Sequence, residues 1–146
     1  MKTKLTVLLL LAAMTVPATM LGGKRKQLAS HRGAQAQPQV ILTGDLAAKV
    51  YGYQGPTPLK ITIKNGVIAD IEALENQESP QYFKRATAKV FPQYIGKTVA
   101  EGLSLEADGA TGATYSSDAL FKNIQLGLEQ AKTSQAKKQA KRQSRK

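Results

Sequence analysis

The chain has 146 residues, a length typical of one domain, and a formal net charge of +11. It contains no cysteine, which excludes disulfides, thiolate metal sites and cysteine nucleophiles. Its single histidine, His31, lies outside residues 37–131, so Ser-His-Asp catalysis and histidine metal sites are excluded within that region.

The positive charge lies in the two flanks of the chain. Residues 1–36 contain six Lys or Arg, and residues 132–146 contain seven. Residues 37–131 contain the remaining eight together with all ten acidic residues, which gives that region a net charge of −2. The central region therefore does not have the composition of a nucleic-acid-binding domain. Like-charge blocks such as the flanks are typical of solvated tails.

The N-terminus has the pattern of a targeting segment. Lys2 and Lys4 precede an apolar run over residues 5–21, interrupted only by three threonines. At 17 residues the run is shorter than the roughly 20 residues of a typical membrane span, and it also fits a signal peptide. We predict a signal peptide or N-terminal membrane anchor over 1–21, and an exported protein in the periplasm or on the extracytoplasmic face of the membrane. Residues 22–44, rich in Gln, Ala, Gly and basic residues, are predicted to be a linker.

The next region predicts a β-hairpin. A first strand is expected over 46–53, and residues 58–64 then alternate apolar and polar side chains, as a strand with one buried face does. Asn65-Gly66 is a strong hairpin signal, because type I′ turns need positive φ at both central residues. Residues 67–74 are expected to return as the partner strand.

Helices are expected in the second half of the chain. Ser79-Pro80 predicts an N-cap and first helical residue, with the helix ending near Val90, before Pro92. A short helix or turn is expected over 94–101, a short strand over 103–107, and a last helix from Asp118 to about residue 132. The predicted fold class is α+β, a small antiparallel sheet with an early hairpin, packed with two or three helices. The basic tail, 132–146, is expected to be frayed helix passing into disorder.

The run Asp108 to Ser117 combines small residues with hydroxyl groups. Glycine and alanine let the backbone approach a ligand closely, and Gly112 takes positive φ at little cost. Ser116, Ser117 or Asp118 can each cap the following helix, and a helix N-terminus favours a phosphate. The pattern fits a phosphate-binding turn that presents a hydroxyl, and it equally fits an ordinary capping turn.

This run also resembles a known motif. Asp108-x-x-Thr111-Gly112-Ala113-Thr114 is similar to the flavinylation motif of the FMN-binding domain family. The resemblance implies that Thr114 carries FMN through a phosphoester bond. It also implies that Asp108, Thr111, Gly112 and Ala113 are read by a dedicated flavin transferase. Residues 51–56 and 59–68 look like the family's opening segment and first hairpin, and Glu78-Ser79-Pro80 is similar to its Glu-Thr-Pro segment. The predicted domain covers 45–131.

The resemblance implies a function as well as a cofactor. The protein would be an exported electron carrier that works with a membrane or extracytoplasmic redox partner; whether it also has enzyme activity of its own is left open. Ser116 belongs to the implied cofactor site, Glu78 is expected at the flavin edge, and Tyr82 and Tyr115 are the aromatic residues nearest the motifs. The candidates for packing against the flavin ring are Tyr51, Tyr53, Tyr82, Phe83, Tyr94 and Tyr115.

Two other functions stay open at this stage. One is a module that binds FMN without a covalent bond. The other is a basic protein that acts through its Lys-rich tail on an anionic membrane surface or a nucleic acid. Export would remove most nucleic acid from reach, so no nucleic-acid partner is expected. The tail is open to two interpretations: a purely solubilising segment, or one that attracts an anionic membrane surface or an acidic partner.

Overall fold

The computed structural model describes residues 37–145. The predicted targeting segment, 1–21, and most of the predicted linker lie outside these residues. Within the described part of the chain, none of the helices combines the length and the apolar character that crossing a bilayer requires.

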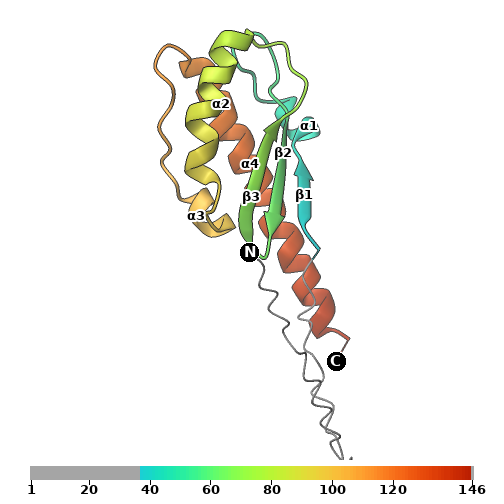
Figure 1. Ribbon diagram of the computed structural model, residues 1–146. Coiled ribbons are helices and arrows are strands. Elements are labelled where there is room, and N and C mark those ends of the chain that lie inside the picture. Colours follow the sequence, from blue (N-terminus) through green and yellow to red (C-terminus); the bar gives the residue numbers. More distant parts are fainter. Residues whose placement is uncertain (1–36, 146) are drawn as a thin grey trace, which may run out of the picture. The chain divides into compact units, whose positions relative to one another are not determined.

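Three antiparallel strands form one sheet in the order β1-β2-β3 (Figure 1). They are β1 (Gln39–Leu42), β2 (Leu59–Lys64) and β3 (Val67–Ala73). The β2–β3 hairpin closes as expected, because Asn65 has φ 51° and Gly66 has φ 79°, the left-handed conformations that a tight hairpin turn requires. The strand pairing places Ile61 opposite both Ile41 and Ile71.

Four helices accompany the sheet within residues 37–145: α1 (Gly44–Ala47), α2 (Pro80–Tyr94), α3 (Val99–Leu103) and α4 (Thr114–Gln143). The long helix α4 packs against α2, α3 and the inner face of the sheet. Gly127 makes this approach possible, since a Cβ there would lie 2.6 Å from Ile61 Cδ1. The centre of the core is fully buried and consists of Leu59, Ile61, Ile68, Val90, Leu120, Ile124 and Leu128.

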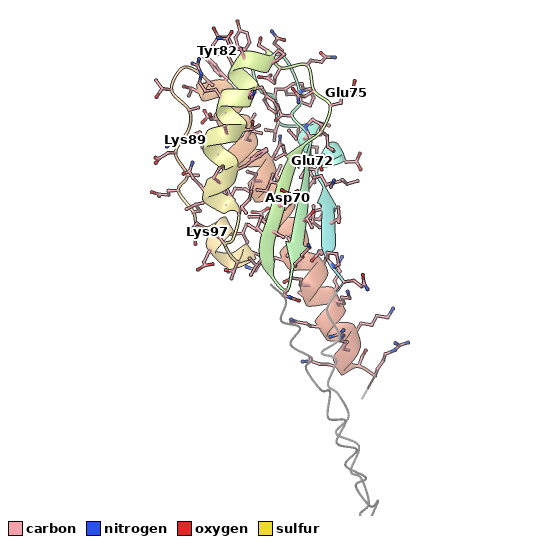
Figure 2. All side chains as sticks on the ribbon, in the orientation of Figure 1. Asp70, Glu72, Glu75, Tyr82, Lys89 and Lys97 are labelled. Carbon is pink, nitrogen blue, oxygen red and sulfur yellow. The ribbon has the colours of Figure 1, made fainter. Side chains whose placement is uncertain are left out.

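The outer face of the sheet is polar over β2 and β3, and on β1 it carries the exposed apolar side chains of Val40 and Leu42. Lys60 and Glu72 form an ion pair across β2 and β3. Asp70 and Glu72 on β3, like Lys89 on α2, are exposed, and their side chains are labelled in Figure 2. One buried and one solvated sheet face is the arrangement that the alternation in β2 predicts. The predicted α+β class, with its early hairpin and C-terminal helix, is confirmed.

The prediction of a strand over 46–53 is wrong. The first strand is β1, inside the range predicted as linker, and α1 follows it at Gly44. Ile41 is buried against the core, and the Thr43 hydroxyl accepts a hydrogen bond of 2.8 Å from the Leu59 amide. These contacts reach residues more than a dozen positions away, so the local pattern did not reveal them.

Helix α2 continues past the predicted end near Val90 and includes Pro92. Val90 and Tyr94 are both buried, so core packing holds the last turn. Pro92 and Ala88 are exposed, and water can therefore satisfy the Ala88 carbonyl that lacks its helical partner.

The region after α2 differs from the prediction in three further places. Residues 105–110 form no strand. The last helix begins at Thr114 rather than Asp118, and its N-cap is Ala113, which makes no side-chain capping hydrogen bond. None of Ser116, Ser117 and Asp118 is therefore the cap. Helix α4 also runs to Gln143, where the tail was expected to be frayed helix passing into disorder. Alanine, glutamine and lysine have high helix propensity.

Candidate functional site

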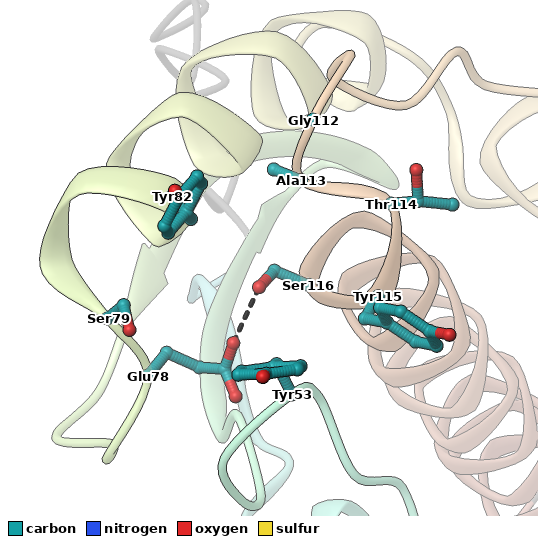
Figure 3. Close-up of a pocket in the computed structure, with 9 residues that line it drawn as sticks. All are labelled: Tyr53, Glu78, Ser79, Tyr82, Gly112, Ala113, Thr114, Tyr115 and Ser116. Atoms are coloured by element: carbon teal, nitrogen blue, oxygen red, sulfur yellow. Dashed lines mark hydrogen bonds between the residues drawn. The ribbon is translucent and has the colours of Figure 1, made fainter.

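A cleft of about 280 Å³ lies where the first turn of α4 meets the start of α2 and the loop before β2 (Figure 3). Its size is near the lower end of the roughly 300–1,000 Å³ typical of ligand pockets. The lining residues come from three separate segments of the chain: Tyr53; Glu78, Ser79 and Tyr82; and Gly112, Ala113, Thr114, Tyr115 and Ser116.

Thr114 is the first residue of α4 and its side chain is exposed. Gly112, two residues earlier, has φ 79°, a conformation that turns the loop into the helix and favours glycine. Because Ala113 supplies no side-chain cap, the amide groups of the first helical turn are left to other acceptors. The Thr114 hydroxyl therefore stands beside a group of free donors at the positive end of a 30-residue helix.

Arg85 adds a positive charge near this helix end. A Cβ on Gly112 would lie 3.5 Å from Arg85 Nη1, and the Arg85 guanidinium lies 6.0 Å from the centroid of the Tyr82 ring. Arg85 is not among the residues predicted for the site. Its spacing of three residues from Tyr82 on a predicted helix was the available signal.

Glu78 is only 6% exposed and lies at the inner side of the cleft. Its Oε1 accepts a hydrogen bond of 2.7 Å from the Gln54 amide, and its Oε2 accepts one of 2.5 Å from the Ser116 hydroxyl. A Cβ on Gly52 would lie 2.6 Å from Glu78 Oε1, so glycine leaves room for the carboxylate. Glu78 and Ser116 are among the predicted site residues, whereas the supporting roles of Gly52 and Gln54 were not predicted.

Three tyrosines surround the opening of the cleft. Tyr53 and Tyr115 have ring centroids 6.2 Å apart and are 72% and 71% exposed. Tyr82 lies across from them and is 48% exposed. Of the other aromatic candidates, Phe83 and Tyr94 are buried in the core, and Tyr51 is not among the lining residues.

Asp108 and Thr111 are exposed and do not line the cleft. The backbone of Asp108 is tied to α2, because the Gln93 side chain accepts from its amide at 2.8 Å and donates to its carbonyl at 2.9 Å. The Ser117 hydroxyl accepts a hydrogen bond of 3.0 Å from the Ala110 amide. The small-residue loop is thus fixed at both ends, with its middle open to solvent.

These features fit a phosphorylated aromatic cofactor. Amide groups at a helix N-terminus and Arg85 suit a phosphate, and three half-exposed or exposed tyrosines suit a planar ring system. In the described residues 37–145 there is no cluster of three or more side chains suited to hold a metal ion. The fold and the site define a small cofactor-binding domain.

A family model described as the FMN-binding domain matches residues 52–129, more than half of the 146-residue chain. The chain belongs to this family, and its cofactor is FMN. A search of curated proteins found no match.

Proposed function

We propose that this flavoprotein is an exported electron carrier whose FMN is joined to Thr114 by a phosphoester bond. The observation that carries the proposal is the position of the Thr114 hydroxyl. It is exposed, it belongs to the first residue of α4, and it lies on the rim of the cleft that the tyrosines surround. A phosphate bonded there would sit beside the amide groups of the first helical turn and near Arg85.

Attachment requires a separate flavin transferase. A threonine hydroxyl is a weak nucleophile without a general base, and the residues lining the cleft include no histidine. In the proposed reaction Thr114 Oγ bonds to the FMN phosphorus of FAD, the diphosphate bond breaks, and AMP leaves. The hydroxyl proton passes to a base on the transferase. Asp108 and Thr111 also support attachment by a separate enzyme, because both are exposed and a second protein can contact them.

Bound FMN supplies one- and two-electron redox chemistry, and the residues of this chain would hold and tune it. Tyr53, Tyr82 and Tyr115 offer the apolar surface for the ring, and Glu78 places a carboxylate that accepts two hydrogen bonds on the cleft side. The apolar run of residues 5–21 supports export, and a covalent bond retains a cofactor that would otherwise diffuse away outside the cytoplasm. We propose a membrane or extracytoplasmic redox partner.

The test is the intact mass of the full chain after co-expression with a flavin transferase. We expect an increase equal to FMN less one water, located on the peptide that contains Thr114. Thr114→Ala should remain unmodified, whereas Thr133→Ala, an exposed threonine of α4 outside the motif, should be modified like the wild type. Stoichiometric flavin in Thr114→Ala would show that Thr114 is not the attachment point. Release of the flavin from the wild type on denaturation would show that binding is not covalent.

A further inference from the structure

The last part of α4 extends past the domain core. Ala131 is the last fully buried residue of the helix, and from Lys132 to Arg145 every side chain is exposed except the half-buried Gln135. In Figure 1 this red end of the helix projects beyond the turn between β2 and β3. The extension contributes little to the core, so packing does not explain which residues it contains.

This extension is strongly basic. Glu129 is the last acidic residue of the chain, and in residues 37–145 the only ion pair joins Lys60 and Glu72. At 3.6 residues per turn, five of its six cations fall within an arc of roughly 140°. These five are Lys137, Lys138, Lys141, Arg142 and Arg145.

An open groove of about 450 Å³ lies between this extension and the hairpin turn. Lys138 and Arg142 line it from the helix, and Asn65 and Gly66 line it from the turn. Lys64, the exposed last residue of β2, adds a charge at the same end. The extension contains no large apolar side chain, so it can attract an anionic surface but cannot insert into a hydrocarbon layer.

The chain also enters the domain at this end. Gln37 and Pro38 line the groove together with Lys138 and Arg142. The 36 residues before them hold the apolar run of 5–21, which is predicted to be a signal peptide or an N-terminal membrane anchor. Thr114 lies at the other end of α4, about 36 Å from Lys138 at 1.5 Å per residue.

We propose that residues 132–145, with Lys64, form a docking surface for anionic lipid headgroups. Docking would hold the hairpin-turn end of the domain against the membrane and direct the cleft away from it, toward a redox partner in the aqueous phase. The positive charge of the extension complements anionic headgroups. The chain also enters the domain at this same end, after the segment predicted to be a signal peptide or membrane anchor. Together these two features favour a lipid surface over a nucleic acid. The proposal does not depend on how FMN is attached.

The test compares three full-length proteins that carry the same residues 1–36. They are the wild type, K137Q/K138Q/K141Q/R142Q, and a control that loses the same charge elsewhere, K49Q/K84Q/K89Q/K122Q. Each is mixed with vesicles of phosphatidylcholine alone or with added phosphatidylglycerol, and the partition ratio between the two compositions is measured at low and high salt. Amide hydrogen exchange of residues 132–145 is followed in the same samples.

We expect the tail variant to lose at least about tenfold in this ratio, since each Lys or Arg near an anionic surface contributes about 1 kcal/mol. The control should lose much less. Exchange in 132–145 should slow only with the anionic vesicles, and high salt should reverse the effect. Equal losses in the two variants, or unchanged exchange, would overturn the proposal. The proposal would also be overturned if the wild type bound a duplex oligonucleotide or an acidic peptide more tightly than the anionic vesicles at the same salt, and the tail variant lost that binding.

Discussion

The Ser116 hydroxyl donates a hydrogen bond of 2.5 Å to Glu78 Oε2, which joins the first turn of α4 to the segment before α2. The two residues are 38 positions apart in the chain, and both are buried. Because Oε1 of the same carboxylate accepts from the Gln54 amide, Glu78 connects all three segments that line the cleft. The shape of the site therefore depends on one acidic side chain.

Replacement of Glu78 should lower the free energy of unfolding and change the midpoint potential of bound FMN. Glu78→Ala leaves the Gln54 amide and the Ser116 hydroxyl without their acceptor, and we expect a loss of about 1–3 kcal/mol in the free energy of unfolding. Glu78→Gln keeps one acceptor and should cost less. It removes a negative charge beside the cleft, so the midpoint potential of bound FMN should rise.

Urea unfolding of the flavin-free protein and potentiometric titration of the loaded protein measure these two effects. Glu75→Gln is the control, because Glu75 is a nearby exposed acid outside the cleft. A potential that Glu78→Gln shifts no more than Glu75→Gln does would contradict the placement of Glu78 beside the flavin.

Gly52→Ala should disturb the same carboxylate from the other side. The added Cβ would lie 2.6 Å from Oε1 and 2.8 Å from Cδ of Glu78, so the carboxylate must move away from the Gln54 amide. We expect destabilisation of about 1–3 kcal/mol, as for other overpacked sites. Gly44→Ala is the matched control, because a Cβ there meets nothing within 4 Å. If thermal unfolding shows the same midpoint for both variants, the close contact at Gly52 is not a constraint in solution.

The elements that depend on neighbouring residues could be predicted from the sequence. The β2–β3 hairpin follows from the alternation in residues 58–64 and from Asn65-Gly66, which take the left-handed conformation expected of them. Strand β1 could not be found in this way. Its stability comes from pairing with β2, 20 or so residues later, and its apolar sequence is only Val40-Ile41-Leu42 after a proline.

The candidate site shows the same division. Seven predicted site residues meet around one cleft: Glu78, Tyr82, Gly112, Ala113, Thr114, Tyr115 and Ser116. Their roles toward FMN stay predictions. The roles of Gly52, Gln54, Arg85 and Gln93 were not predicted, because each acts through a contact with a distant segment. Gly52 and Gln54 lie in the recognised segment 51–56, but the resemblance assigned them no contact with Glu78. The start of α4 was placed too late because the sequence analysis looked for a capping side chain, and the helix begins without one.

Acid should weaken the end of the domain that carries α3. Glu101 accepts hydrogen bonds from the backbone amide and the hydroxyl of Thr98, at 2.7 and 2.8 Å. The Thr98 amide is the larger cause that lowers the pKa of Glu101 below its ordinary value of 4.5. A lowered folded-state pKa stabilises the fold above the unfolded-state pKa, and this contribution is lost as the pH falls through the folded-state pKa.

Urea unfolding midpoints measured from pH 7 to about pH 3 test this expectation. Glu101→Gln should lower the midpoint at pH 7 and flatten its decline below about pH 4.5. Glu106→Gln is the control, because Glu106 is exposed and accepts no hydrogen bonds like those that Glu101 accepts from Thr98. Its unfolding midpoint should fall with pH as that of the wild type does. An unchanged acid slope in Glu101→Gln would mean that the hydrogen bonds between Glu101 and Thr98 do not form in solution.

Arg85 should promote loading of the cofactor. Its guanidinium lies over Tyr82 and reaches toward Gly112, two residues before the proposed attachment point. A hydrogen bond to a charged group contributes about 1.5–3 kcal/mol, so Arg85→Gln should slow the transferase-dependent gain of FMN roughly tenfold or more. Lys84→Gln removes the same charge from the preceding residue, which is also exposed but makes neither the contact with Tyr82 nor the approach to Gly112. Mass spectra taken at intervals after addition of transferase and FAD give both rates. Because a general loss of surface charge would slow both variants alike, only a slower rate in Arg85→Gln than in Lys84→Gln assigns the phosphate to the Gly112 end of α4.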